Sequence, residues 1–290
     1  MNIAVMADSS SGISQAEAKE LGVYIAPVPV YINGELFYED LTITQEQFYE
    51  RLKEGSNVST SQPNPQTVAD MWAELLETYD AIIYVPISSG LSETGLNLAK
   101  LAENEERFKG KIFVVDNHRV SLTQKQSVLD ALKMANDGKT AQEIYDYLTE
   151  TSAQSSIYIT VDSLKYLKKS GRLSHAAATI GSILKIKPVL QIQGEKLDRF
   201  ALVRKFSEAK KAMISALKND LATRFKRLVE AGKMVLGIAY TDNLDEAEKL
   251  KNEVRTAIPE VELTLWSPLS LSVSSHVGPG SIGIGCAVKY

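Results

Sequence analysis

The sequence predicts an α/β protein of two domains. The first is expected to be a three-layer α/β/α domain with a mainly parallel sheet, and the second a two-layer α/β domain with a mixed sheet. The length of 290 residues corresponds to about two domains. Short, uniformly apolar runs alternate with helical segments in the first half, which is typical of parallel strands covered on both faces. In the second half several predicted strands follow one another directly, which favours a mixed sheet with helices on one face.

The first domain begins with a short apolar strand, Ile3–Ala7. A capping box at Ser14–Glu17 predicts the start of a helix, because the two side chains satisfy backbone N–H groups that a helix leaves free. Asn33-Gly34 is a strong hairpin signal, since both residues readily adopt positive φ angles. We therefore expect Tyr24–Ile32 to pair with Glu35–Tyr38.

The remainder of the first domain alternates helices with strands. A capping box at Thr44–Gln47 begins a helix that ends near Glu54. After a loop at Ser56–Asn64, Pro65 is expected at the first position of the next helix. The further elements expected in this half are a strand at Ala81–Ile87, a helix at Glu93–Glu106, a strand at Lys111–Val115 and two helices between Ser121 and Thr151.

A polar segment, Thr149–Ser156, marks the expected link, so the two domains should cover residues 1–155 and 156–290. The elements expected in the second domain are a strand at Ile157–Val161, two helices between Asp162 and Leu184, a hairpin of Ile186–Ile192 with Leu197–Val203, a long helix at Ser207–Ala231, a strand at Lys233–Tyr240, a helix at Leu244–Ala257, and strands at Glu260–Trp266 and Ile282–Val288.

Charge is distributed unevenly between the two halves. Residues 1–155 hold 11 Lys and Arg against 23 Asp and Glu, a net charge of −12, whereas residues 156–290 carry a net charge of +8. This contrast indicates either that the domains face different partners or only that their solvated helices differ in charge.

Composition argues against several kinds of site. Cys286 is the single cysteine, which excludes an internal disulfide and a multi-cysteine zinc site. The three histidines, His118, His175 and His276, are far apart in sequence, so we expect neither a metal site nor a cofactor. The N-terminus lacks a secretory signal and no run is apolar enough to span a bilayer. A cytoplasmic protein without stable membrane insertion is therefore expected.

Three loops are rich in hydroxyl groups: Ser9–Ser11, Ser59–Asn64 and Ser88–Ser92. We expect them at the edge of the parallel sheet where open α/β sheets bind ligands. Two of them lead into helices, whose N-termini favour an anion. Hydroxyl donors without a P-loop lysine or a metal-binding carboxylate cluster suit a single carboxylate better than a triphosphate. The alternative interpretation is that these residues only cap helices and form turns.

Two motifs resemble signatures of other chemistry. Gly278–Gly283 fits the pattern GxGxxG, but no helix or acidic residue can follow it, so we interpret it as a tight turn before the last strand. Gly90–Gly95 is a near match to the nucleophile elbow GxSxG, with Thr94 where glycine is required. Together with His276, expected in a glycine-rich loop, it leaves open an acyl hydrolase or acyltransferase that uses Ser92.

Basic residues recur at helical spacing early in the second domain, at Lys165, Lys168, Lys169 and Arg172. They either stabilise the dipole at a helix C-terminus or form a docking surface for a protein partner. In the second case Arg172, Lys168 and Lys169 are the docking candidates. Nucleic acid is not an expected partner, because the isoelectric point is about 5.6 and no aromatic residues are interleaved with the basic ones.

Together these segments resemble the DegV family of bacterial fatty acid-binding proteins. The motifs that carry the resemblance occur in family order along essentially the whole chain: DSSSG at 8–12, STSQP at 59–63, SSGLSET at 88–94, VVDN at 114–117, LKKSGRLS at 167–174, IKPVL at 186–190 and HVGPG at 276–280. The resemblance implies two α/β domains that enclose a long acyl chain in a buried apolar tunnel, and a binding protein rather than an enzyme.

The resemblance also implies residue roles. Thr60 and Ser92 would hold the carboxylate of a long-chain, palmitate-like fatty acid, with His276 close by. In some family members the fatty acid is presented to a separate ATP-dependent fatty-acid kinase for lipid metabolism, and Arg172 lies in a motif typical of the family. The further candidates for the ligand site are Ser61, Gln62, Ser9, Ser88, His276 and Gly278.

Three residues depart from the family pattern. Asn117 and Ser170 replace a serine and a glycine, and Glu93 replaces the glycine after Ser92. A carboxylate at Glu93 would repel a bound carboxylate unless its side chain points outward.

Overall fold

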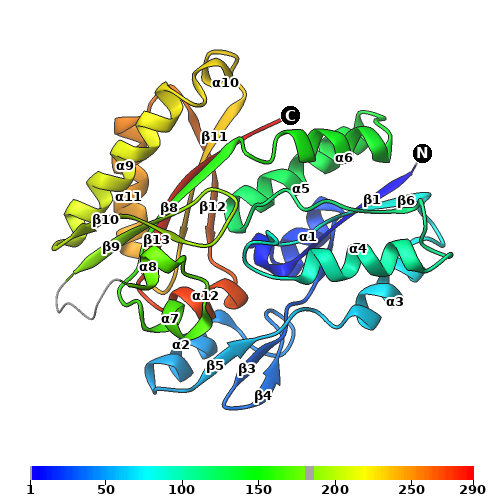
Figure 1. The fold of residues 1–290 in the computed structure, drawn as a ribbon, viewed down its shortest axis with the longest axis horizontal. Coiled ribbons are helices and arrows are strands. Elements are labelled where there is room, and N and C mark those ends of the chain that lie inside the picture. The colour runs from blue at the N-terminus through cyan, green and yellow to red at the C-terminus, as the bar shows by residue number, and fades with distance from the viewer. Residues whose placement is uncertain (1, 180–185) are drawn as a thin grey trace.

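A computed structural model describes residues 2–179 and 186–290 (Figure 1). The first domain is built on a four-stranded parallel sheet with the strand order β2-β1-β6-β7. These strands are β1 (Ile3–Asp8), β2 (Tyr24–Ala26), β6 (Ala81–Val85) and β7 (Ile112–Val114). The expected parallel sheet is confirmed.

Helices cover both faces of this sheet because consecutive residues of its central strands are apolar and point alternately to either face. Val5 and Ala7 of β1 pack with α1 (Gln15–Leu21), α5 (Ser121–Asn136) and α6 (Ala141–Glu150). Ala4 and Met6 face the opposite way, toward α3 (Pro65–Leu75) and α4 (Thr94–Asn104). All six residues of β1 are buried, and the first domain therefore has the three expected layers.

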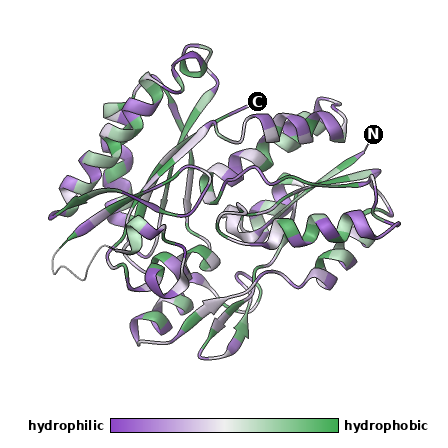
Figure 2. Ribbon diagram, in the orientation of Figure 1, coloured by the Kyte–Doolittle hydropathy of each residue, from purple (hydrophilic) through white to green (hydrophobic). Residues whose placement is uncertain are grey.

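The second domain contains a six-stranded mixed sheet with the order β10-β9-β8-β13-β11-β12. Its strands are β8 (Ser155–Thr160), β9 (Lys187–Ile192), β10 (Asp198–Val203), β11 (Met234–Tyr240), β12 (Glu262–Pro268) and β13 (Ile282–Val288). The β11–β12 pair is parallel and the other neighbours are antiparallel. Helices α9 (Phe206–Ala222) and α11 (Leu244–Ala257) cover one face, as expected, and hydrophobic and hydrophilic residues alternate along α9 (Figure 2).

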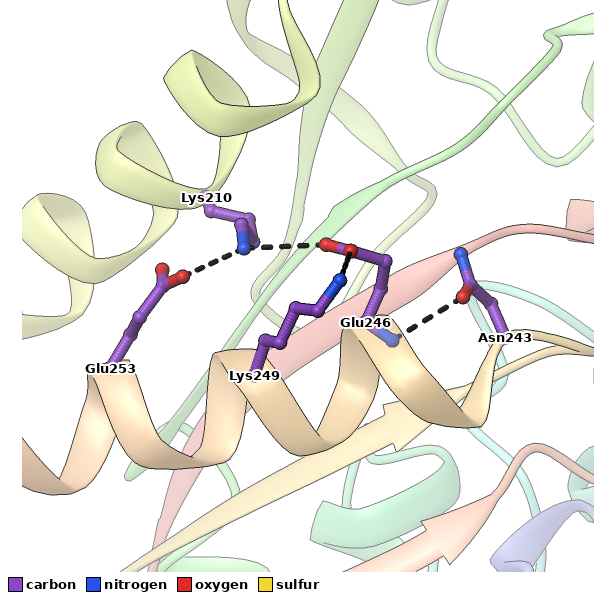
Figure 3. Close-up of polar contacts among 5 residues, drawn as sticks. All are labelled: Lys210, Asn243, Glu246, Lys249 and Glu253. Carbon is purple, nitrogen blue, oxygen red and sulfur yellow. Dashed lines mark hydrogen bonds and ion pairs between the residues drawn. The ribbon is translucent and has the colours of Figure 1, made fainter.

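A buried lysine ties these two helices together. The ammonium of Lys210 on α9 lies 2.7 Å from Glu253 and 3.4 Å from Glu246, both on α11 (Figure 3). Its side chain is 8% exposed, so water solvates the ammonium poorly and the two carboxylates balance its charge. The N-cap of α11 is Asn243, whose side chain accepts from the backbone N–H of Glu246.

The other face of the mixed sheet meets the first domain. It packs on the start of α5, on α7 (Lys165–Ser170) and on α12 (Leu271–Val277). Helix α5 therefore lies between the two sheets and contacts both (Figure 1). The expected boundary between residues 155 and 156 stays a prediction; α6 ends at Glu150 and β8 begins at Ser155.

The structure corrects the expected strand Tyr24–Ile32. It divides into β2, in the parallel sheet, and β3 (Val30–Ile32), in a separate three-stranded antiparallel sheet. Pro27 and Pro29 lie between the two strands, and a proline has no N–H to donate to a sheet. The hairpin at Asn33-Gly34 is confirmed, because β3 pairs with β4 (Glu35–Phe37).

The expected loop Ser56–Asn64 is also only partly a loop. It contains β5 (Val58–Thr60), which pairs with β3 in the three-stranded sheet. Helix α2 (Gln45–Lys53) has the expected capping box and packs beneath this sheet. The same apolar cluster includes Leu271 of α12, so this part of the N-terminal half is packed on the C-terminal half.

Two helices differ from expectation in the second half. The expected helix Ser207–Ala231 is broken after Ala222, because Phe225 turns into the core and is 3% exposed; α10 (Lys226–Glu230) follows. His276 lies in helix α12 and not in a loop. Of the helices expected between Asp162 and Leu184, α7 and α8 (His175–Ala178) are present, and the expected end near Leu184 lies outside the described residues.

Candidate functional site

A cavity runs between the two domains. Its empty space is about 990 Å³, including the part open to solvent at its mouth. Most of its wall is apolar and comes from the inner face of the mixed sheet and the adjoining helices; this part of the lining includes Leu122, Ile157, Ile159, Leu167, Ile192, Leu197, Ala239, Leu269, Val273 and Val277. The cavity is therefore a continuous apolar space with polar groups confined to parts of its wall.

The polar end of the cavity gathers residues from three predicted regions. Thr60 is the last residue of β5, Ser61 and Gln62 follow it, Ser92 follows β6, and His276 lies on α12. We expected all three hydroxyl-rich loops at one sheet edge, but the segment Ser59–Asn64 begins within β5 of the three-stranded sheet. The loops nevertheless meet, because that small sheet is packed against α12.

Hydrogen bonds orient the side chains at the polar end of the cavity. Oγ1 of Thr60 lies 2.9 Å from Nε2 of His276, and the hydroxyls of Ser92 and Thr94 are 2.8 Å apart. The amide of Asn97 donates to Gln62, at 2.8 Å. Each predicted carboxylate contact is thus oriented by a neighbouring side chain, which leaves its hydroxyl in a defined position at the cavity wall.

His276 is neutral at pH 7. Burial and, to a smaller extent, the positive charge of Arg172 together lower its pKa to about 4. Its Nε2 contacts Thr60, whereas the buried Nδ1 has no hydrogen-bond partner in the described part of the protein. A neutral ring with Nε2 protonated donates to Thr60, and the hydroxyl of Thr60 is then free to donate to a ligand.

Arg172 belongs to this site as well as to the basic motif. It lines the cavity, and its guanidinium donates to the carbonyl oxygen of Ser170 nearby and to that of Leu91 across the interface between the halves. A second hollow shares Thr60, Arg172 and His276 with the cavity and is bordered by Lys165 and Lys169. Lys168 and Lys169 lie on α7 and do not line the cavity; Lys169 contacts Asn57.

Three further candidates from the sequence lie elsewhere. The hydroxyl of Ser9 accepts from the backbone of Val28, and that of Ser88 donates to the carbonyl of Gly194 at 2.7 Å. Gly278 ends α12 with φ +77°, and a Cβ there would lie 2.3 Å from the ring of Tyr166. None of the three lines the cavity in the described structure. Gly278 thus serves the tight turn that was expected before the last strand.

The positions that depart from the family pattern leave the cavity intact. Glu93 is exposed and does not line the cavity, but it borders an outer hollow together with Gln62, Ser92 and Arg172. Ser170 ends α7, where its hydroxyl donates to the carbonyl of Leu167 at 3.1 Å, and Asn117 is fully buried.

Asp8 joins the loops that border the cavity. Its carboxylate accepts from the backbone N–H groups of Ile87 and Ser10, at 2.8 and 3.1 Å, and from the amide of Gln124 at 3.1 Å. Burial raises the pKa of this carboxyl, and the three donors oppose that effect. Asp8 therefore connects β1, the loop after β6 and α5 at one point.

Sequence reasoning missed several lining residues. Thr94, Ser121 and Ser272 line the cavity, together with Ser10. Ser272 was missed because α12 was not predicted. This helix places Ser272 one turn before His276. Ser121 has φ +53°, a conformation that is uncommon for serine and that the sequence does not signal.

The described ranges contain neither a metal-binding cluster nor a membrane-spanning helix. Within residues 2–179 and 186–290, no group of three side chains suited to bind a metal ion is found. None of the helices in these ranges is both long and apolar enough to cross a bilayer.

Comparison with known proteins gives one consistent result. The model of the DegV family, whose description is "Uncharacterised protein, DegV family", matches residues 2–289. A DegV domain-containing protein of Deinococcus radiodurans is 31% identical, with 98% of each chain covered.

Two solved structures are similar over nearly the whole chain. A DegV family protein of Thermus thermophilus, described for its fatty acid binding, has a TM-score of 0.87 and 27% identity, covering 99% of this chain and all of its own. DegV of Bacillus subtilis, a fatty acid-binding protein, has a TM-score of 0.86 and 27% identity over all of both chains. Both descriptions give binding, and neither gives a catalytic activity.

Proposed function

Because this chain belongs to the DegV family, we propose that it binds a long-chain, palmitate-like fatty acid in the cavity between its domains. The observation that carries this proposal is the cavity itself, which is apolar along most of its wall and has Thr60, Ser92 and His276 at one end. Fatty acid binding by the solved relatives supports the same ligand class.

The apolar wall accounts for most of the affinity in this proposal. Each buried methylene stabilises a complex by about 0.8 kcal/mol, so roughly 14 methylenes supply about 11 kcal/mol before the costs of ordering the chain. A hydrogen bond to a charged group contributes about 1.5–3 kcal/mol. The tail thus holds the ligand, and the hydroxyl groups decide which end lies at the mouth.

The carboxylate is proposed to receive hydrogen bonds from Thr60 and Ser92. His276 acts on Thr60 by donating from Nε2, which turns the threonine hydroxyl toward the ligand. Arg172 is the one fully charged side chain of the cavity lining in the described ranges, and its charge complements a carboxylate. Ser61 and Gln62 complete the polar end of the wall.

We further propose that the protein carries the fatty acid in the cytoplasm and presents its carboxylate to a separate ATP-dependent kinase. The hollow that shares Thr60 and His276 with the cavity supports this role, because it connects the head-group site with the surface of α7. Lys168 and Lys169 on that helix are the proposed contacts to the partner. Arg172 is less suited to a docking test, since it also lines the cavity.

A serine hydrolase receives less support. The hydroxyl of Ser92 is hydrogen-bonded to Thr94, and His276 is hydrogen-bonded to Thr60. The candidate nucleophile and the candidate base therefore have different partners. If Ser92 were a nucleophile, an activated acyl ester would leave a covalent acyl group on it. We expect no such adduct by mass spectrometry of the intact protein.

The experiment that tests the proposal is native mass spectrometry of the purified protein, followed by extraction and identification of the bound lipid. We expect one long-chain fatty acid per chain, which organic extraction removes and added hexadecanoic acid restores. Protein that is free of lipid and takes up no hexadecanoic acid would contradict the proposal.

Presentation to a kinase requires a separate test. Reversing the charges of Lys168 and Lys169 to Glu should abolish kinase-dependent phosphorylation of the bound fatty acid and leave fatty-acid binding intact. Unchanged phosphorylation would exclude this surface as the docking site, and loss of both properties would indicate misfolding.

A further inference from the structure

The cavity contains a second polar patch, formed by Ser10, Ser121 and Ser272. These residues are 2%, 5% and 5% exposed, and all three line the cavity. They come from the short 3-10 helix η1 (Ser9–Ser11), the first position of α5 and the first turn of α12. Helix η1 packs against both α5 and α12, which brings the three elements together in space.

Three hydroxyl groups of this region form a chain of hydrogen bonds. Oγ of Ser272 lies 3.2 Å from that of Ser10 and 2.9 Å from that of Ser270. The side chain of Ser10 also hydrogen-bonds to the carboxylate of Asp8. Ser10 and Ser272 are therefore held in place at the cavity wall.

Ser121 is the unpartnered member of the patch. Its Oγ is buried and has no hydrogen-bond partner in the described ranges. A buried hydroxyl without a partner costs free energy, and a native protein rarely leaves such a group on a cavity wall unless something fills the space. A polar group of a ligand would give Ser121 the partner that the described residues do not supply.

The position of the patch along the cavity is set by α12. Ser272 and His276 are four residues apart, so they lie on the same face of the helix about 6 Å apart along its axis. Val273 lines the cavity from the same helix, and Leu269 lines it from just before the helix. The patch is consequently close to the head-group end and distinct from the Thr60–His276 contact.

We propose that this serine patch binds an oxygen substituent on the acyl chain near its carboxyl end, so that the protein favours a hydroxylated fatty acid over the plain one. This inference rests on the proposed function. A methylene at the patch leaves Ser121 unpaired, whereas a hydroxyl group of the ligand accepts from Ser121 and donates to a neighbouring serine oxygen.

The test is a competition for the binding site between hexadecanoic acid and its 3-hydroxy, 5-hydroxy and 12-hydroxy forms, read by native mass spectrometry. Wild-type protein should prefer a 3- or 5-hydroxy form over hexadecanoic acid by about three- to tenfold, the range expected for one hydrogen bond. The 12-hydroxy form should bind more weakly than hexadecanoic acid, because its hydroxyl is buried against an apolar wall.

Variants then assign the preference to the patch. Ser272→Ala, Ser10→Ala and Ser121→Ala should reduce or remove the preference while keeping hexadecanoic acid bound. Ser275→Ala is the matched control, because Ser275 lies on the same helix, donates to the carbonyl of Leu271 at 2.7 Å and does not line the cavity. It should keep the preference.

Two results would overturn the inference. Weaker binding or equal binding of every hydroxylated form by wild-type protein would show that the patch takes no ligand oxygen, as would a preference that survives in all three patch variants. Failure of hexadecanoic acid itself to bind would count against the proposed function, so the two failures are distinguishable.

Discussion

Thr60 and His276 are 216 positions apart in the chain, yet Oγ1 of the threonine lies 2.9 Å from Nε2 of the histidine. The contact joins β5 of the three-stranded sheet to α12 of the C-terminal half. Because His276 is neutral at pH 7, this contact orients a hydroxyl without adding a positive charge. Arg172 is then left to balance the charge of a carboxylate at the same end of the cavity.

Removing the predicted head-group hydroxyls should weaken binding without unfolding the protein. We expect Thr60→Ala and Ser92→Ala each to lower affinity for hexadecanoic acid about 10- to 100-fold, since each loses a hydrogen bond to a charged group. Titration calorimetry measures this loss. Ser59→Ala is the matched control, because Ser59 is exposed and does not line the cavity. Wild-type affinity in the double variant would show that neither hydroxyl contacts the ligand.

Gly90 should be intolerant of even one added methyl group. A Cβ at this position would lie 2.8 Å from Cα of Glu195 and 3.0 Å from the carbonyl oxygen of Gly194. Gly90→Ala therefore pushes the Ser92 loop away from the β9–β10 loop, so the mouth of the cavity widens. We expect at least tenfold weaker fatty-acid binding, and a fall in stability of about 1–3 kcal/mol.

The neighbouring substitution Ser89→Ala serves as the control for Gly90→Ala. It alters the same loop without entering the contact with Gly194 and Glu195, and it should leave both binding and the melting temperature near wild type. Equal behaviour of the two variants would mean that the approach of the loops does not control the cavity.

Lys210 should stabilise the packing of α9 on α11. Lys210→Ala removes the cation between Glu246 and Glu253 and leaves two partly exposed carboxylates facing each other (Figure 3). We expect a loss of about 1–2 kcal/mol in the free energy of unfolding, because water can solvate the carboxylates in part. Lys210→Met should lose less, since it keeps the packing of the side-chain stem. Denaturant titration at low and high salt measures both, and the difference from wild type should shrink with salt.

Hydrophobic periodicity and capping residues predicted the helices and strands whose bounds depend on neighbouring residues in the sequence. Leu244–Ala257 and Ile282–Val288 have the bounds that their patterns indicate, and Pro65 begins α3. Strand β5 was missed because its three residues are a strand only through pairing with Val30–Ile32. This contact is distant in sequence, and periodicity over three residues carries no information about it.

Helix α12 shows why the site was harder to predict than the fold. A serine-rich segment has low intrinsic helix propensity. It is helical here because Ser270 caps it, and because Leu271 and Val277 are buried on it. Thr60, Ser92 and His276 were placed together by resemblance to a family, and not by any spacing in the sequence. The serine patch, which lacks such a resemblance, was visible only after α12 and η1 had been brought together.

Stability should depend on pH through His276. Its folded-state pKa of about 4 is below the value of about 6.5 in an unfolded chain, so unfolding takes up a proton between these values. The contribution of this histidine to stability is therefore fully present above pH 6.5 and is lost as pH falls toward 4. A loss of about 2–3 kcal/mol is expected, and it should be absent in His276→Gln.

Glu39 should show the opposite dependence. Its carboxylate accepts from the backbone N–H of Leu271, the first residue of α12, and from the amide of Gln45, both at 2.9 Å. Burial raises the pKa of Glu39 to about 7, above its ordinary value of 4.5. The folded state thus holds a proton that the unfolded state releases, so this contribution is present below pH 4.5 and is lost as pH rises through 7, by about 2 kcal/mol.

His276 lies on α12 and Glu39 contacts its first residue, and their contributions to stability change with pH in opposite directions. Both contributions should therefore be measured together. Between pH 4.5 and 6.5 their effects oppose each other, so the free energy of unfolding of wild-type protein should change less with pH than that of either variant. Relative to wild type, Glu39→Gln should become more stable as pH rises, and His276→Gln should become more stable as pH falls. Chemical denaturation at five pH values between 4.5 and 7.5 measures both differences, with Ser275→Ala as a control on α12 that does not titrate. If the variant curves run parallel to the wild-type curve, neither group changes its proton affinity on folding, and the lowered pKa assigned to His276 is wrong.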